Sequence, residues 1–117
     1  MPEQPLLVDV HTHAMPLPLL RRLERDRLAD LSRLGQETIQ LDEIISGLPP
    51  GEPIPCRPAQ HRVEDRLRLM DEAGAAVHLV STPPFLLGQA VTDPDRAAAL
   101  LRYANDALAE FAAAAPD

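Results

Sequence analysis

The residues of this chain with the clearest chemical potential are His11 and His13, which follow a short apolar run over residues 6–10. Side chains two residues apart point to the same side of an extended strand, so both imidazoles can converge on one metal ion. Neutral imidazole is a common ligand for zinc and similar divalent metals. Two loop histidines that hydrogen-bond to the backbone can also stand two residues apart. The spacing alone therefore leaves both a metal site and such a loop pair open.

The elements that must position this pair begin with the apolar run itself. We predict a strand over residues 6–10, buried on both faces as in a parallel sheet. Leucines at helical spacing predict a helix over residues 17–34, which ends at Gly35. An excursion over residues 36–60 follows, with a strand or half of a small hairpin over residues 37–45 and a proline-rich extended loop after it.

The second half of the chain predicts three further elements. They are a helix over residues 62–73, a strand over residues 76–81, and a helix over residues 94–115 that opens with Asp93 and Pro94. Two strands joined through a helix form a parallel βαβ unit. The pattern contains no third strand of this sheet, and two apolar strands with open outer edges do not complete a sheet. We therefore expect an α/β fold that is unfinished.

Composition narrows the class of protein further. Aromatic residues make up only 3% of the chain, so alanine and leucine must do most of the packing, which favours helices. The net charge of −7 leaves no basic surface for nucleic acid. A single cysteine, Cys56, excludes an internal disulfide and suits a reducing compartment. With no signal-peptide pattern and no membrane-spanning apolar run, we expect a cytoplasmic protein without membrane contact.

Three segments of the chain have patterns that can be compared with known families. The first is Leu7-Val8-Asp9-Val10-His11-Thr12-His13 with Pro16 after it. The second runs from Arg62 through Met70-Asp71-Glu72-Ala73-Gly74 to Thr82-Pro83, and the third contains Tyr103-Ala104-Asn105-Asp106 and Phe111-Ala112. Together they resemble the amidohydrolase superfamily, and more narrowly its subgroup of amidohydrolase-related decarboxylases typified by aminocarboxymuconate-semialdehyde decarboxylase. The likeness covers nearly all of this chain but only about the first third of a full-length family member.

The resemblance implies a fold, a metal centre and a reaction. The fold is the N-terminal portion of a metal-dependent (β/α)₈ TIM barrel, truncated after the second strand and its helix. His11 and His13 would be the first-strand ligands of a divalent metal, zinc or alternatively manganese, and Arg57 would bind a substrate carboxylate. The activity would be non-oxidative decarboxylation of a carboxylated unsaturated or aromatic small molecule, with a homo-oligomer as one possible assembly. The alternatives are a metal-dependent hydrolase of the same superfamily and a non-catalytic truncated remnant.

Other candidate residues have an ordinary structural explanation beside the functional one. Asp9 either orients a histidine or caps a turn. His61 precedes a helix, and His78 lies inside the second strand, so neither is predicted to be a ligand. A solvated loop position explains Arg57 equally well, although a guanidinium suits bidentate binding of a carboxylate. Cys56 has no activating arrangement in the sequence. The family's remaining ligands, which are further histidines and an aspartate, cannot be placed on this chain, so we expect the chain alone to be inactive.

Overall fold

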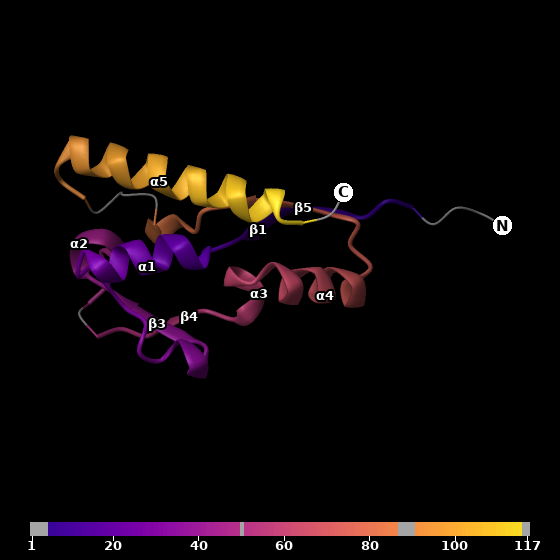
Figure 1. The fold of residues 1–117 in the computed structure, drawn as a ribbon, viewed down its shortest axis with the longest axis horizontal. Helices are drawn as coiled ribbons and strands as arrows, with labels where there is room; N and C mark the ends of the chain where they lie inside the picture. The colour runs from indigo at the N-terminus through magenta and orange to yellow at the C-terminus, as the bar shows by residue number, and fades with distance from the viewer. Residues whose placement is uncertain (1–4, 50, 87–90, 116–117) are drawn as a thin grey trace.

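The computed structural model describes residues 5–49, 51–86 and 91–115 and shows a mixed α/β protein with two small sheets (Figure 1). The described part contains no closed barrel. The elements in chain order are β1 (Val8–His13), α1 (Leu17–Arg25), β2 (Ala29–Asp30), η1 (Leu34–Gln36), β3 (Thr38–Leu41), α2 (Glu43–Ser46), β4 (Ile54–Pro55), α3 (Pro58–His61), α4 (Val63–Ala73), β5 (Val77–Ser81), η2 (Pro84–Leu86) and α5 (Pro94–Ala113). Within these ranges no helix is both long and apolar enough to cross a membrane.

The first sheet is the parallel pair of β1 and β5, which the sequence predicts from its strand–helix–strand order. Val8 lies opposite Val77, and His13 lies opposite Ser81. β1 begins later than expected and continues through both histidines, because the pairing with β5 extends to His13. The backbone N–H of Ala14 then donates to the Ser81 carbonyl over 3.1 Å, which prolongs the contact past the end of the strand.

The expectation that the first strand is buried is wrong for the described residues. Leu6 and Val10 are each 71% exposed, and Leu79 on β5 is 54% exposed. α4 and α5 lie along this pair in Figure 1, but they cover it incompletely. The apolar residues of these strands are typical of strands that are buried on both faces. In the described chain nothing packs over their outer positions.

The predicted helix over residues 17–34 is also wrong beyond Arg25. Leu28 donates its N–H to the Leu23 carbonyl over 2.7 Å, and Arg27 donates to the Glu24 carbonyl over 3.0 Å. This pair of bonds is the Schellman motif, which closes a helix through a left-handed residue. Arg27 supplies that conformation with a φ of 61°, although glycine is the usual residue there. The leucine pattern continues past this point because Leu28 also packs on the core.

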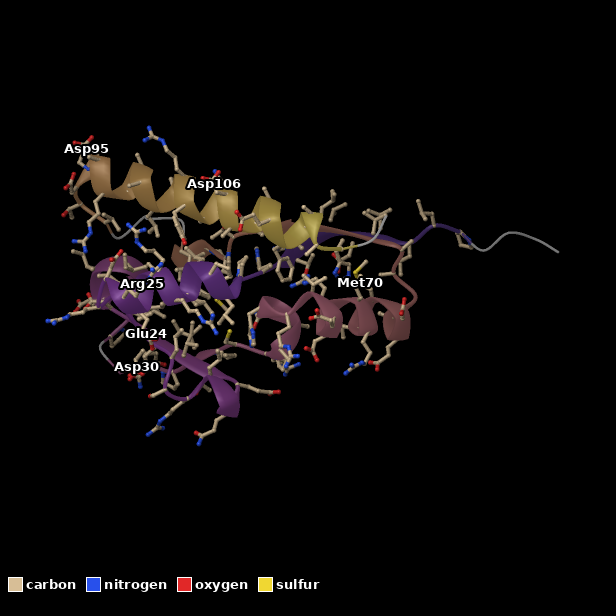
Figure 2. The ribbon with its side chains drawn as sticks, viewed as in Figure 1. Glu24, Arg25, Asp30, Met70, Asp95 and Asp106 are labelled. Atoms are coloured by element: carbon tan, nitrogen blue, oxygen red, sulfur yellow. The ribbon has the colours of Figure 1, made fainter. Side chains whose placement is uncertain are left out.

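The chain after α1 forms the second sheet instead of more helix. β3 pairs antiparallel with both β2 and β4, so residues 37–45 contain the predicted strand. The Glu24 carboxylate accepts the N–H of Leu31 over 3.1 Å and ties this sheet to the end of α1. Figure 2 shows Glu24 and Asp30 close to one another in this region, at the lower left of the molecule.

The later helices lie where the sequence predicts them, and each has a clear start or stop. Gly74 ends α4 in the left-handed conformation, with a φ of 71°. Asp93 caps α5 by accepting the N–H of Asp95 over 3.0 Å, and Pro94 occupies the first turn. Figure 2 labels Asp95 at this end of the helix. Asp93 and Pro94 thus determine where the long α5 begins, and Gly74 determines where α4 ends.

The hydrophobic core lies between α1, the second sheet and α5 rather than around the parallel pair. Its fully buried side chains include Met15, Leu19, Leu20, Ile39 and Ile45. By contrast, the one buried residue of α4 is Arg66. The excursion over residues 36–60 and the helices α1 and α5 therefore share the apolar packing, while the strands of the β1–β5 unit contribute little.

Cys56 is part of this core and is expected to be chemically inert in the native protein. It is fully buried, and burial raises the pKa of its thiol to about 11. At pH 8 the thiolate would then be about one thousandth of the native thiol, against roughly a quarter of an exposed one. We expect Ellman's reagent to react at least about 100-fold more slowly with native protein than with urea-unfolded protein. Equal rates would show that Cys56 is accessible and ionised, as an activated nucleophile must be.

Candidate metal-binding site

The structure brings His11 and His13 together on β1. Their ring centroids lie 5.2 Å apart, and the ring planes are nearly perpendicular, at 87°. His11 is exposed and His13 is half-buried. The Thr12 hydroxyl between them contacts α4 instead, so the two imidazoles share one side of the strand and Thr12 faces the other.

A bulge in β1 lies directly beside this pair. Asp9 is opposite His78 and Thr12 is opposite Val80, so β1 has two residues where β5 has only Leu79. A bulge leaves one residue outside the regular ladder and changes the direction of the neighbouring side chains. The Asp9 carboxylate accepts the backbone N–H of His11 over 3.0 Å and bridges the irregular stretch. Asp9 therefore caps the bulge, and its hydrogen bond is to the backbone of His11 rather than to its ring.

Ser81 determines which nitrogen of His13 is available to a ligand. The Ser81 hydroxyl lies 3.0 Å from Nδ1 of His13 and donates its own proton to the Thr12 carbonyl over 3.4 Å. In the tautomer that carries its proton on Nδ1, the ring donates to this hydroxyl. Nε2 of His13 then keeps a free lone pair. Metal-binding histidines commonly hold the other ring nitrogen in this way.

The donor set fits a divalent metal in part. With metal–nitrogen bonds of about 2.0–2.1 Å and a tetrahedral angle, two imidazoles on one zinc have ring centroids about 5 Å apart. The observed separation of 5.2 Å agrees with that value. Among the described residues, however, no group of three or more His, Cys, Asp or Glu side chains could hold an ion. The pair thus supplies two ligands, and catalytic zinc sites usually have three from protein.

Arg57 lies apart from the histidine rings in the described contacts. It is exposed between β4 and α3, where its backbone N–H donates to Oε1 of Gln60 over 2.8 Å. Gln60 in turn accepts the N–H of Met15 at its carbonyl over 2.7 Å. This bond places the start of α3 beside the segment that follows β1. The role of Arg57 in binding a carboxylate stays a prediction.

The two other histidines are separate from the pair. His61 ends α3, and its buried Nδ1 has no hydrogen-bond partner among the described residues. Burial lowers the pKa of His61, with a smaller lowering from Arg62 and an opposing effect of Asp65. His78 is half-buried in β5 and contacts Arg66 through Nδ1 over 3.2 Å. His78 has a neighbouring partner, as expected of a histidine inside a strand, whereas His61 lies at the end of α3 rather than at the start of a helix.

Arg66, the most connected polar residue near the site, is not among the functional residues predicted from the sequence. Its guanidinium is bonded to the His13 carbonyl over 2.6 Å and to the Thr12 hydroxyl over 3.1 Å. The residue is only 6% exposed. One signal was present, since Arg66 stands four residues before Met70 on the helix face that turns toward the strands. An arginine at such a position is unusual because the charge must be satisfied by buried acceptors.

A cavity of about 480 Å³ lies on the α4 side of the sheet, between α4, β5 and α5. Its lining includes Arg66, Met70, His78 and Phe111 but neither His11 nor His13. Met70 is labelled in Figure 2 between α4 and the strands. This hollow is therefore distinct from the site of the two imidazoles.

Fold and site together define a mixed α/β protein with a parallel strand pair that carries two adjacent imidazoles. No protein-family model matches the chain, and a search of curated proteins finds no significant match.

Proposed function

We propose that this chain carries the first-strand metal ligands of an amidohydrolase-related enzyme, most simply a non-oxidative decarboxylase of a carboxylated unsaturated or aromatic small molecule. One observation carries the proposal. The imidazoles of His11 and His13 lie 5.2 Å apart near the carboxyl end of a parallel strand, and Ser81 leaves Nε2 of His13 free to bind. In α/β barrels the carboxyl ends of the parallel strands are where active sites lie.

The parallel pair supports the corresponding fold proposal, which is part of a (β/α)₈ barrel. Leu6, Val10 and Leu79 are apolar yet exposed, as expected of strands whose natural surroundings include further elements. Both outer edges of the pair are unpaired in the described chain. Additional strands would cover these positions and provide the ligands that the pair lacks.

Each residue of the site has a defined role in this proposal. His11 and His13 bind a divalent metal, zinc or manganese, while Ser81 holds the ring of His13 in one tautomer. Arg57 binds the substrate carboxylate through its guanidinium. When bound, the metal supplies Lewis-acid chemistry and lowers the pKa of a coordinated water. The buried thiol of Cys56 agrees with a reducing, cytoplasmic compartment.

The proposed reaction breaks the bond between the carboxyl carbon and the neighbouring substrate carbon. Its electron pair stays on the substrate carbon, which takes up a proton, and CO₂ leaves without an oxidant. In the hydrolase alternative, water adds to a carbonyl carbon and an amine or alcohol leaves. The other alternative, a non-catalytic truncated remnant, is favoured by a different observation, namely that no group of three or more ligating side chains lies together among the described residues.

The test uses purified protein loaded with zinc or manganese and aromatic or unsaturated acids labelled with ¹³C in the carboxyl group. Because two protein ligands do not complete a catalytic centre, we expect this chain alone to retain metal through His11 and His13 but to release no labelled bicarbonate, as followed by NMR. Metal-dependent release that is lost in His13→Ala is expected from a protein in which further barrel strands accompany these residues. Release of amine or alcohol from amide and ester analogues by that protein would instead identify a hydrolase. Absence of turnover even with those strands present would support the non-catalytic alternative. Turnover that is unaffected by chelation or by His13→Ala would contradict all three.

A further inference from the structure

Arg66 is buried at a position where an amphipathic helix normally presents an apolar side chain to the sheet. It is only 6% exposed in the middle of α4. None of the ion pairs among the described residues includes it. Burial lowers its pKa, and the nearby Asp9 carboxylate acts in the opposite direction. A guanidinium held in this way must be satisfied by neutral acceptors, because a buried charge without partners is strongly unfavourable.

Those acceptors come from several different elements. Nε donates to the Ala59 carbonyl in α3 over 2.9 Å, and Nη2 donates to the His13 carbonyl in β1 over 2.6 Å. Nη1 lies 3.1 Å from the Thr12 hydroxyl and 3.2 Å from Nδ1 of His78. The guanidinium carbon also lies 5.7 Å from the centroid of the Phe111 ring in α5. One side chain therefore joins α3, α4, α5 and both strands of the parallel pair.

Two of these bonds hold the part of β1 that follows the bulge. The extra residue between Asp9 and Thr12 interrupts the regular pairing with β5. Arg66 holds the Thr12 side chain and the His13 carbonyl, so it fixes the peptide from which the His13 ring projects. The Ser81 hydroxyl then fixes the ring itself on the opposite face. Backbone and ring are thus fixed by separate groups.

We propose that Arg66 is a positioning residue for the metal-binding pair, and that its guanidinium holds His13 in the orientation that binds metal. The proposal rests on the proposed function for its metal-binding consequence. Its structural consequence, a single His13 tautomer, can be measured without metal. Lysine at this position keeps a charge but replaces a planar fork of five donors with one ammonium, which cannot reach all these acceptors.

The test compares Arg66→Met and Arg66→Lys with Arg68→Met, a matched control on the exposed face of the same helix. Arg68 has a side chain that is 71% exposed and only a 3.7 Å contact to Asp65. Three quantities are measured: the His13 tautomer by ¹⁵N NMR of the metal-free protein, the zinc affinity by competition with a chromophoric chelator, and the urea midpoint. Affinities are measured where each variant is fully folded.

For Arg66→Met we expect a mixture of His13 tautomers and a zinc affinity about tenfold weaker, the scale seen when a residue that orients a ligand is lost. Arg66→Lys should recover part of both changes, and Arg68→Met should change neither. If Arg66→Met does not fold, Thr12→Val takes its place. This variant removes one acceptor and leaves Arg66 present, and it should shift the His13 signals toward a mixture of tautomers. A lower urea midpoint with unchanged His13 tautomer and zinc affinity would overturn the proposal. If wild-type protein bound no zinc but its His13 tautomer still depended on Arg66, the positioning role would stand and the proposed function would fail.

Discussion

Replacing His11 and His13 together by alanine is expected to weaken zinc binding by about 100-fold or more. Loss of a residue that merely orients a ligand costs about 10–100-fold in metal affinity, and loss of the ligands themselves costs more. The structure places the two rings at a separation suited to one ion, 5.2 Å between centroids. Competition with a chromophoric chelator, or calorimetric titration, measures the change.

His61→Ala is the matched control for this experiment. His61 is also a half-buried histidine, but it ends α3 and is not part of the pair. Its removal should leave zinc affinity within about twofold of the wild type. If the double variant bound zinc as tightly as the wild type, while His61→Ala lost binding, the metal site would have to lie elsewhere in the chain.

Ser81→Ala gives a graded version of the same test. The Ser81 hydroxyl contacts Nδ1 of His13 over 3.0 Å. Its removal should weaken zinc affinity about tenfold while both ligands remain. An effect as large as that of the double variant would indicate that Ser81 acts on more than the tautomer of His13.

The sequence predicted the elements whose signals are local. Gly74 stops α4, and Asp93 with Pro94 starts α5, because left-handed glycine and side-chain capping are properties of a few neighbouring residues. The parallel pairing of β1 with β5 follows from the helix that lies between them. The adjacency of His11 and His13 follows from the two-residue period of a strand.

The features that the sequence did not predict depend on contacts between distant segments or on rare backbone choices. α1 stops at Arg25 because Arg27 adopts a conformation that favours glycine, and no residue type marks it. The bulge beside Thr12 is visible only once β1 and β5 are aligned. Arg66 is recognised as a buried hub only when Thr12 and His13, more than fifty residues away, are placed against it. Local patterns therefore predict the histidine pair but not the groups that hold it.

Leu20→Ala is expected to destabilise the protein by about 2–5 kcal/mol, the range for truncating a fully buried leucine. Leu20 is 0% exposed on α1, at the centre of the core that α1 forms with the second sheet and α5. The cost has two parts, because the smaller side chain loses burial and leaves a cavity that close-packed neighbours fill incompletely. Urea denaturation followed by circular dichroism gives the change in the free energy of unfolding.

Leu69→Ala tests whether the core formed by α1, the second sheet and α5 dominates stability over the helix α4. Leu69 lies on α4 and is 47% exposed, so its truncation should cost no more than about 0.5 kcal/mol. The contrast follows from where the buried apolar side chains lie, since α4 buries only Arg66 while α1 buries Leu19, Leu20 and Leu23. Equal losses for the two variants would mean that α4 is covered in solution by something that the described chain does not include.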